Sequence, residues 1–240
     1  MKVQRPADLA RDIVAACRIL DGKGLVEAYG HVSARMPGRD LLMVTPRGGL
    51  DALQPRDLLI VDLRGRLVRG RGTPPLELSM HTEAYRRRPD LGALCRTHST
   101  MAGAWSTLGR SLPATHGFGS FLGPEVPVFP KPDLITTDAL GAELAQVLGS
   151  GEAVLLRGNG TLVVGRTVSE ACVKALFLEE SARIQCLIAG AGTPLALTPE
   201  ELARRTDVPY DHYGRAWQYY RARFASGVTR ARGSRRKAAR

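Results

Sequence analysis

The chain has 240 residues, of which 44% are hydrophobic and 24% are charged, so it can bury a sizeable core and is not disordered throughout. Its formal net charge is +11, but eight of the 34 basic side chains and none of the 23 acidic ones lie in residues 221–240. Residues 1–220 are nearly balanced in charge, which argues against a nucleic-acid-binding face. We expect one domain over residues 1–220 and a basic, disordered tail over 221–240.

The chain shows no sign of export or membrane insertion. Its first residues lack the continuous apolar run of a signal peptide, and no later run reaches membrane-spanning length. The cysteines lack the paired spacing of metal or redox motifs and are typical of buried thiols in a reducing compartment; they are Cys17, Cys95, Cys172 and Cys186. We therefore expect a cytoplasmic protein without a membrane partner.

Hydrophobic periodicity and turn residues predict an alternation of helices and short strands. In chain order we expect helix Pro6–Leu20, strands Leu41–Thr45 and Leu58–Leu63, a hairpin return at Leu67–Val68, helix Pro75–Arg88, strand Leu91–Thr97, helix Thr100–Leu108, strand Glu125–Phe129, helix Thr137–Leu148, strands Ala153–Leu156 and Thr161–Val164, and helices Ser169–Ala189 and Pro209–Phe224. Because the elements do not follow a regular strand–helix–strand repeat, the pattern favours a mixed sheet covered by helices over a doubly wound parallel sheet.

The common nucleotide and serine-hydrolase motifs are absent. The sequence has no Gly-x-Gly-x-x-Gly after a strand, no phosphate loop ending in Gly-Lys-Ser/Thr and no Gly-x-Ser-x-Gly elbow. Chemistry must therefore come from Glu77, from the five histidines and from three loops. The loops are Tyr29-Gly30-His31-Val32-Ser33, Thr45-Pro46-Arg47-Gly48-Gly49 and Arg157-Gly158-Asn159-Gly160-Thr161.

These segments resemble, in the same order, those of the class II aldolase/adducin family, from about Leu9 to about Ala189. The shared features are a Gly-His-x-Ser loop, a Thr-Pro-x-Gly turn, a Glu-x-x-x-His helix, a strand ending in Thr-His-Ser, and the segment from Leu155 to Ala171. The resemblance implies a three-layer α/β/α sandwich around a largely antiparallel mixed sheet. It also implies a homotetramer with active sites between subunits, acting on a small-molecule substrate.

In the aldolases of this family three histidines bind zinc or a similar ion, which stabilises an enediolate, and a nearby Glu acts as acid/base or ligand. Here the matching histidine positions are Arg96, His98 and Asn159, so one imidazole survives. A guanidinium has no lone pair to donate and would repel a cation, and an amide oxygen is a poor zinc ligand. A conventional zinc site is not expected, and His98 is the one remaining candidate ligand.

Three interpretations of this change stay open. Arg96 supplies the positive charge in place of the metal, and the chemistry needs no cofactor. Alternatively, His98 and Glu77 join His31 or His116 in a rebuilt zinc, manganese or iron site, giving a metal-dependent aldolase or an oxygenase. In the third interpretation the site has decayed, and the chain is a binding or assembly protein on the same fold. His81, one helical turn after Glu77, is expected to pack beneath the site.

The residues before Glu77 bear on the substrate. Sugar-phosphate aldolases of this family hold the phosphate partly through a Ser-Ser pair there, whereas this chain has Pro75-Leu76, which offers neither hydroxyl nor a proline N–H. The Thr-Pro-x-Gly turn that begins at Thr45 instead carries a guanidinium, that of Arg47. We therefore expect a non-phosphorylated substrate that carries a carboxylate.

The sequence thus predicts a lyase that makes or breaks a bond beside a carbonyl, by aldol, retro-aldol or decarboxylation chemistry. The residues expected in catalysis are Glu77, Arg96, His98 and, as a proton donor from near the C-terminus, Tyr210. The residues expected to bind substrate are His31, Ser33, Thr45, Arg47, Gly48, His116 and Asn159.

Overall fold

The computed structural model describes residues 4–224. Its main sheet has eight strands in the order β4-β3-β2-β1-β5-β10-β9-β8, antiparallel except for the β8–β9 pair. The strands are β1 (His31–Arg35), β2 (Leu41–Val44), β3 (Leu59–Asp62), β4 (Leu67–Arg69), β5 (Ala93–Thr97), β8 (Val128–Phe129), β9 (Ala153–Leu156) and β10 (Gly160–Gly165), and a separate small sheet pairs β6 (Leu112–Pro113) with β7 (Glu125–Val126).

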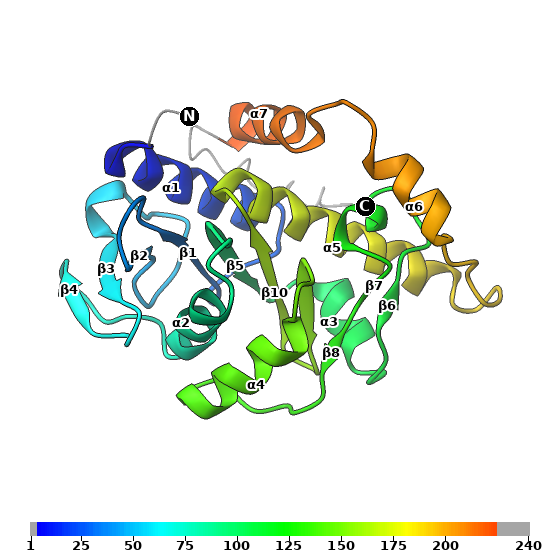
Figure 1. Cartoon of the computed structure of the whole chain (residues 1–240), viewed down its shortest axis with the longest axis horizontal. Helices are drawn as coiled ribbons and strands as arrows, with labels where there is room; N and C mark the ends of the chain where they lie inside the picture. The colour runs from blue at the N-terminus through cyan, green and yellow to red at the C-terminus, as the bar shows by residue number, and fades with distance from the viewer. Residues whose placement is uncertain (1–3, 225–240) are drawn as a thin grey trace, which may run out of the picture.

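Helices cover both faces of the main sheet, which makes the three-layer α/β/α sandwich expected from the sequence (Figure 1). The helices are α1 (Pro6–Gly22), α2 (Leu78–Arg87), α3 (Thr100–Ser106), α4 (Asp138–Leu148), α5 (Val168–Ile188), α6 (Pro199–Thr206) and α7 (His212–Phe224), with short 3-10 turns at Pro55–Asp57 and Gly119–Leu122. Helices α1 and α5 pack on one face of the sheet, and α2 and α4 on the other.

Strand alternation divides the core into two clusters, one on each face of the sheet. In β5, Ala93 and Cys95 belong to the α1/α5 cluster, whereas Leu94 belongs to the α2/α4 cluster. All three side chains are 0% exposed. Burying a large apolar side chain in this way contributes ~1.5–3 kcal/mol, so both sheet faces hold the helices in place.

The pairing of β1 with β5 decides which polar side chains meet. The register sets His31 opposite Arg96 and Ser33 opposite Leu94. Directly paired residues of antiparallel strands point to the same face, so these side chains share the α2/α4 face with Leu94. The sheet therefore delivers His31, Ser33 and Arg96 beneath α2.

The elements differ from the sequence expectation in a few places. The Gly-His-x-Ser segment, expected as a loop, enters β1 at His31. Helix α2 begins at Leu78 rather than at Pro75, which leaves Glu77 at its N-cap position. The strand expected over Glu125–Phe129 is two short strands, because Pro127 lacks the N–H that a continuous ladder needs.

Helix α6 was not expected, although its start carries a recognisable signal. Thr198 accepts a hydrogen bond from the Glu201 amide, the Glu201 carboxylate accepts one from the Thr198 amide, and Pro199 occupies the first helical position. This reciprocal cap with an early proline is a typical helix start. The segment is short and exposed, so it lacks the apolar stripe by which the other helices were predicted.

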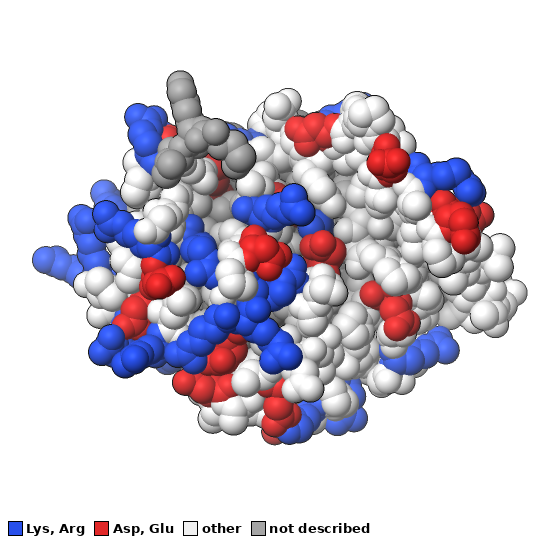
Figure 2. All heavy atoms as spheres, viewed as in Figure 1, with Lys and Arg blue, Asp and Glu red and all other residues white. Residues whose placement is uncertain are grey.

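The C-terminal helix α7 includes the start of the expected basic tail. Arg221 lies 3.8 Å from the Asp12 carboxylate of α1, and Phe224 packs beside Gly22. Residues 225–240, which make up most of that tail, lie outside the described residues. On the face shown in Figure 2, basic side chains gather at the end that carries β2–β4 and α2, with acidic ones among them.

The four cysteines are all free. Cys17, Cys95 and Cys172 are buried free thiols, and Cys186 is partly buried and also free. Between residues 4 and 224, no helix combines the length and apolarity needed to cross a membrane.

The turn between β9 and β10 gives a test of close backbone packing. We expect Gly160→Ala to lower the free energy of unfolding by about 2–5 kcal/mol, because its φ of +92° is left-handed and an added Cβ would lie 2.1 Å from the Thr97 carbonyl oxygen. Gly158→Ala is the matched control, with φ +69° and open space around the new Cβ, and should cost only ~1–2 kcal/mol. Urea unfolding measures both, and equal losses would contradict the packing argument.

Candidate active site

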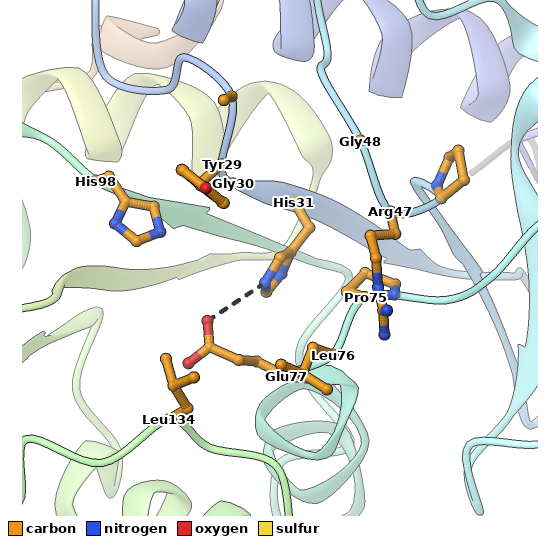
Figure 3. A pocket seen from close by; sticks show the side chains of 12 residues that line it. Tyr29, Gly30, His31, Arg47, Gly48, Pro75, Leu76, Glu77, His98 and Leu134 are labelled. Carbon is orange, nitrogen blue, oxygen red and sulfur yellow. Dashed lines mark ion pairs between the residues drawn. The ribbon is translucent and has the colours of Figure 1, made fainter.

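A cavity of about 360 Å³ opens at the edge of the sheet where β1 begins and where β2 and β5 end. Its walls come from the loops at those strand ends, from the start of α2 and from the loop before α4 (Figure 3). The lining residues are Ala28, Tyr29, Gly30, His31, Pro46, Arg47, Gly48, Pro75, Leu76, Glu77, His98 and Leu134. Antiparallel neighbours bring these distant segments to one edge.

Glu77 points across the cavity floor toward His31 (Figure 3). It stands at the N-cap of α2, but its carboxylate does not cap the helix. Instead Oε1 accepts the Ile135 backbone N–H at 3.2 Å, and Oε2 lies 3.3 Å from Arg96 Nη2 and 3.8 Å from His31 Nε2. The carboxylate is therefore held by Ile135, Arg96 and His31 rather than by the first-turn amides of α2.

Arg96 lies beneath the cavity and does not line it. Its side chain is 0% exposed, Nη1 donates to the Thr97 carbonyl at 2.5 Å, and Nε has no hydrogen-bond partner among the described residues. The contact with Glu77 is an ion pair whose angles are not those of a hydrogen bond. Two charges this deeply buried depend on each other, because removing one leaves the other uncompensated.

His31 and the charge of Arg96 keep Glu77 ionised. Burial raises the pKa of the Glu77 carboxyl, but His31, the Arg96 guanidinium and the Ile135 amide together outweigh burial and lower that pKa to about 2. At neutral pH the carboxylate can accept a hydrogen bond or a proton, and it has no proton to give. The group is a base or a fixed negative charge in any reaction of this cavity.

A row of hydrogen-bonded side chains runs from His31 into the core. His31 Nδ1 lies 2.6 Å from His81 Nε2, His81 Nδ1 lies 2.6 Å from Ser33 Oγ, and Ser33 Oγ lies 3.1 Å from the Tyr85 hydroxyl. Burial lowers the pKa of both imidazoles, and the charge of Arg96 lowers both further. Both rings are therefore neutral at physiological pH.

His98 follows β5 at the mouth of the cavity. Its ring is tilted toward that of Tyr29, with 5.9 Å between the ring centroids. Burial, followed by the charge of Arg96, lowers the pKa of His98 to about 4. This imidazole is neutral in the free protein and stays in contact with solvent, which suits a group that exchanges protons with water.

The donor set does not fit a resident divalent metal. Arg96 occupies the space beside the Glu77 carboxylate with a permanent positive charge, and His81 engages one nitrogen of His31. Within residues 4–224, no three His, Cys, Asp or Glu side chains are gathered to hold an ion, so the rebuilt site of His98, Glu77 and His31 or His116 is not formed there. A divalent cation beside a buried guanidinium would also be repelled.

Five of the sequence-predicted residues line the cavity, and three more, Arg96, Ser33 and Thr45, are buried and do not line it. His31, Arg47, Gly48, Glu77 and His98 belong to the walls. Ser33 and Thr45 are 0% exposed, and Thr45 Oγ1 accepts the Val32 N–H at 3.3 Å, so both support the strands that carry the walls.

Three other predicted residues do not line this cavity of the chain. Asn159 lies at the turn between β9 and β10, where its N–H donates to the Leu156 carbonyl. His116 packs edge-on against Phe118. Tyr210 lines a second cavity of about 650 Å³, and its hydroxyl accepts from Arg215 at 2.7 Å.

Sequence reasoning missed the apolar part of the walls. Tyr29, Leu76 and Leu134 are 72%, 54% and 52% exposed, so the site presents large apolar surfaces to its contents. Tyr29 and Leu76 each adjoin a recognised motif, and that proximity was an available signal. Leu134 lies in a loop without any motif and reaches the cavity only through tertiary folding.

Lowering the pH below about 6.5 is expected to destabilise the protein. The unfolded chain takes up protons on His31 and His81 near their ordinary pKa of 6.5, whereas the folded chain keeps both neutral. The unfolded state then binds more protons, so the free energy of unfolding falls as the pH falls. Below about 4.5 Glu77 adds to this loss, because its folded pKa of about 2 lies below its unfolded value.

Urea unfolding at a series of pH values measures this slope. The double variant His31→Asn/His81→Gln should show a shallower dependence between about pH 6.5 and 4.5, because it lacks both imidazoles. A double variant with the wild-type slope would show that the two imidazoles do not carry the effect.

The chain is similar over most of its length to known proteins. The Class II Aldolase and Adducin N-terminal domain matches residues 11–186. The chain is 30% identical over 235 residues to a 3,4-dihydroxyphthalate decarboxylase of Arthrobacter keyseri, covering 90% of this chain and 94% of that protein. It is 31% identical over 186 residues to an L-fuculose phosphate aldolase of Methanococcus vannielii, covering 74% of this chain and 96% of that protein.

A solved structure agrees with these matches. An L-fuculose 1-phosphate aldolase superposes with a TM-score of 0.78 at 26% identity, covering 83% of this chain and 95% of the other. The named relatives break carbon–carbon bonds, either as decarboxylases or as aldolases. Since the family domain spans more than half of the sequence and the fold agrees, the chain belongs to the class II aldolase and adducin family.

Proposed function

We propose that this lyase decarboxylates an aromatic carboxylic acid without a metal. The observation that carries the proposal is the composition of the cavity wall, in which apolar side chains stand beside a single guanidinium, that of Arg47. The similarity to 3,4-dihydroxyphthalate decarboxylases, which extends over about nine tenths of the chain, supports the same substrate class. The enzyme is proposed to be a cytoplasmic homotetramer.

The walls suit a flat ring that carries an anionic group. Tyr29, Leu76 and Leu134 offer apolar surface to the ring, and Arg47 can hold a carboxylate through two parallel hydrogen bonds. Pro75 and Leu76 leave no hydroxyl group in front of Glu77 to receive a phosphate. A cavity of about 360 Å³ is large enough for one small ring, since small-molecule sites begin at ~300 Å³.

The reaction needs an acceptor for the ring hydroxyl and a proton source, and the site has one group for each role. In a substrate with a ring hydroxyl, the ionised Glu77 carboxylate accepts a hydrogen bond from that hydroxyl, which raises the electron density of the ring. The ring carbon that carries the carboxylate then takes a proton, delivered from solvent through His98. The carbon–carboxylate bond breaks, its electron pair restores the aromatic ring, and carbon dioxide leaves.

Arg96 serves this scheme through Glu77. Together with His31, its buried charge keeps the carboxylate ionised and therefore able to accept a strong hydrogen bond from the ring hydroxyl. His98 has a pKa of about 4 in the free enzyme, and the negative charge of a bound substrate would raise that pKa and make protonation easier. In the proposed homotetramer, Tyr210 of one subunit would supply a proton donor to the cavity of a neighbour, as the family resemblance implies.

Decarboxylation of 3,4-dihydroxyphthalate is the first activity to assay, by release of carbon dioxide. Arg47→Met is expected to raise KM about 10- to 150-fold, because a hydrogen bond to a charged group is worth ~1.5–3 kcal/mol. Arg56→Met is the matched control, since Arg56 is 79% exposed and does not line the cavity, and its KM should not change. Turnover of L-fuculose 1-phosphate with none of the aromatic acid would overturn the substrate class.

Metal independence has a separate test. Protein purified without affinity tags or chelators is expected to carry far less than one equivalent of zinc, manganese or iron, and to keep its activity after treatment with a chelator. The reason is the charge of Arg96 beside Glu77. One metal ion per chain, with activity lost on chelation and restored on adding the metal back, would contradict this part of the proposal.

A further inference from the structure

The row of side chains behind His31 has no role in the reaction scheme above. Its inner members come from two elements, with Ser33 on β1 and both His81 and Tyr85 on α2. His81 and Ser33 are 0% exposed and Tyr85 is 1% exposed. Buried polar groups are costly unless they bond to one another, and a fully connected row of this kind holds its members rigidly.

Two directions of hydrogen bonding satisfy the whole row. In the first, Tyr85 donates to Ser33, Ser33 donates to His81 Nδ1, and His81 Nε2 donates to His31 Nδ1, which leaves the proton of neutral His31 on Nε2. In the second, every bond is reversed, and His31 Nε2 becomes a bare lone pair. Each neutral imidazole has one donor and one acceptor nitrogen, so the bonds of His31 and His81 all run in the first direction or all in the second. In the second direction Ser33 Oγ can also accept from Tyr85, which does not change the two imidazoles.

The end of the row at the cavity selects the first direction. His31 Nε2 faces Glu77 Oε2 at 3.8 Å, and that oxygen belongs to an ionised group that can only accept. A bare lone pair facing this carboxylate would be repelled, whereas an N–H is attracted. Burial, with a smaller effect of the Arg96 charge, lowers the pKa of both rings, so both imidazoles are neutral.

The far end of the row does not provide an exit for protons. Tyr85 is enclosed in the core, and burial raises the pKa of its hydroxyl well above the ordinary value. A charged group, Arg35, also lies near the Tyr85 ring. Its guanidinium is 5.0 Å from the ring centroid and donates to the Tyr85 carbonyl at 2.7 Å. Within residues 4–224, the Tyr85 hydroxyl is hydrogen-bonded to Ser33, so the row ends in the core and acts as a fixed support.

We propose that His81 and Ser33 are positioning residues that hold His31 with its proton on Nε2, so that His31 presents a hydrogen-bond donor to the cavity. The group that this donor fits is an anionic oxygen, such as a carboxylate or a phenolate of the ligand. Together with Arg47 on another wall, it gives the cavity two separate donors for an anionic ligand. The role in substrate binding rests on the proposed function, but the proton position does not.

Nitrogen NMR of histidine-labelled protein tests the inference without any substrate. The chain has five histidines, so ¹⁵N-histidine labelling gives a small set of signals, which the variants His98→Asn, His116→Asn and His212→Asn help to assign. We expect Nε2 to be protonated in both His31 and His81, together with a nitrogen–nitrogen coupling between His81 Nε2 and His31 Nδ1 across their 2.6 Å contact. A proton on Nδ1 of either ring, or no coupling, would overturn the inference.

Two substitutions of His81 distinguish a role in hydrogen bonding to His31 from a role in filling space. His81→Gln retains an N–H that can donate to His31, whereas His81→Leu has a similar volume and no donor. Turnover of 3,4-dihydroxyphthalate, as kcat/KM, is expected to fall about tenfold or more in the Leu variant and to be largely kept in the Gln variant. Equal losses in two folded variants, judged by circular dichroism, would show that His81 only fills space.

The two parts of the experiment fail independently. If the NMR result is as expected and the aromatic acid is not decarboxylated, the proposed reaction is wrong while the support of His31 stands. If the acid is decarboxylated and His31 carries its proton on Nδ1, the reaction stands and the support is wrong. Ser33→Ala gives a further check, because it removes the donor to His81 Nδ1 and should shift that nitrogen signal alone.

Discussion

The site depends on one buried ion pair, between Glu77 and Arg96. A guanidinium with 0% exposure needs an opposite charge, and Glu77 is the acidic group that the structure brings within 3.3 Å. The pair fixes the ionisation of Glu77 and contributes to the neutrality of His31, His81 and His98. Burial and this positive charge under the cavity floor together keep the three imidazoles neutral, and the charge acts with His31 to keep Glu77 ionised.

Strand register explains why these groups meet at all. His31 and Arg96 are paired neighbours on β1 and β5, and alternation turns both side chains toward α2. The start of α2 brings Glu77 over them, and the next turn brings His81. A shift of either strand by one residue would turn these side chains to the other sheet face, where the apolar helices α1 and α5 pack.

The sequence predicted the layers well because each layer has a strong periodic signal. Leu94, Leu162 and Val164 alternate with residues of the other face, and α1 and α5 carry long apolar stretches. The motif segments were also sufficient to indicate the family, and five of the predicted residues line one cavity. Helix α6 escaped notice since it buries nothing, although its capping residues are visible in the sequence.

Side-chain direction was the part that the sequence could not supply. Arg96 was expected to touch a substrate, but the structure directs it to Glu77 from below the floor, and Arg47 is the guanidinium of the wall. Nothing in the local sequence distinguishes these two arginines. Likewise His81 and Ser33 have ordinary neighbours in the chain, and their contact with His31 follows from the packing of a helix on a strand.

The positions of Arg96 and Asn159 also bear on how such a site can change over generations. An added Cβ at Gly160, next to Asn159, would lie 2.9 Å from Arg96 Nη1, so the turn and the guanidinium are in contact. In the genetic code, arginine and asparagine each have codons one base away from histidine codons. Two single-base changes would therefore replace Arg96 and Asn159 by histidine, which gives the three-histidine pattern that the family resemblance implies at positions 96, 98 and 159.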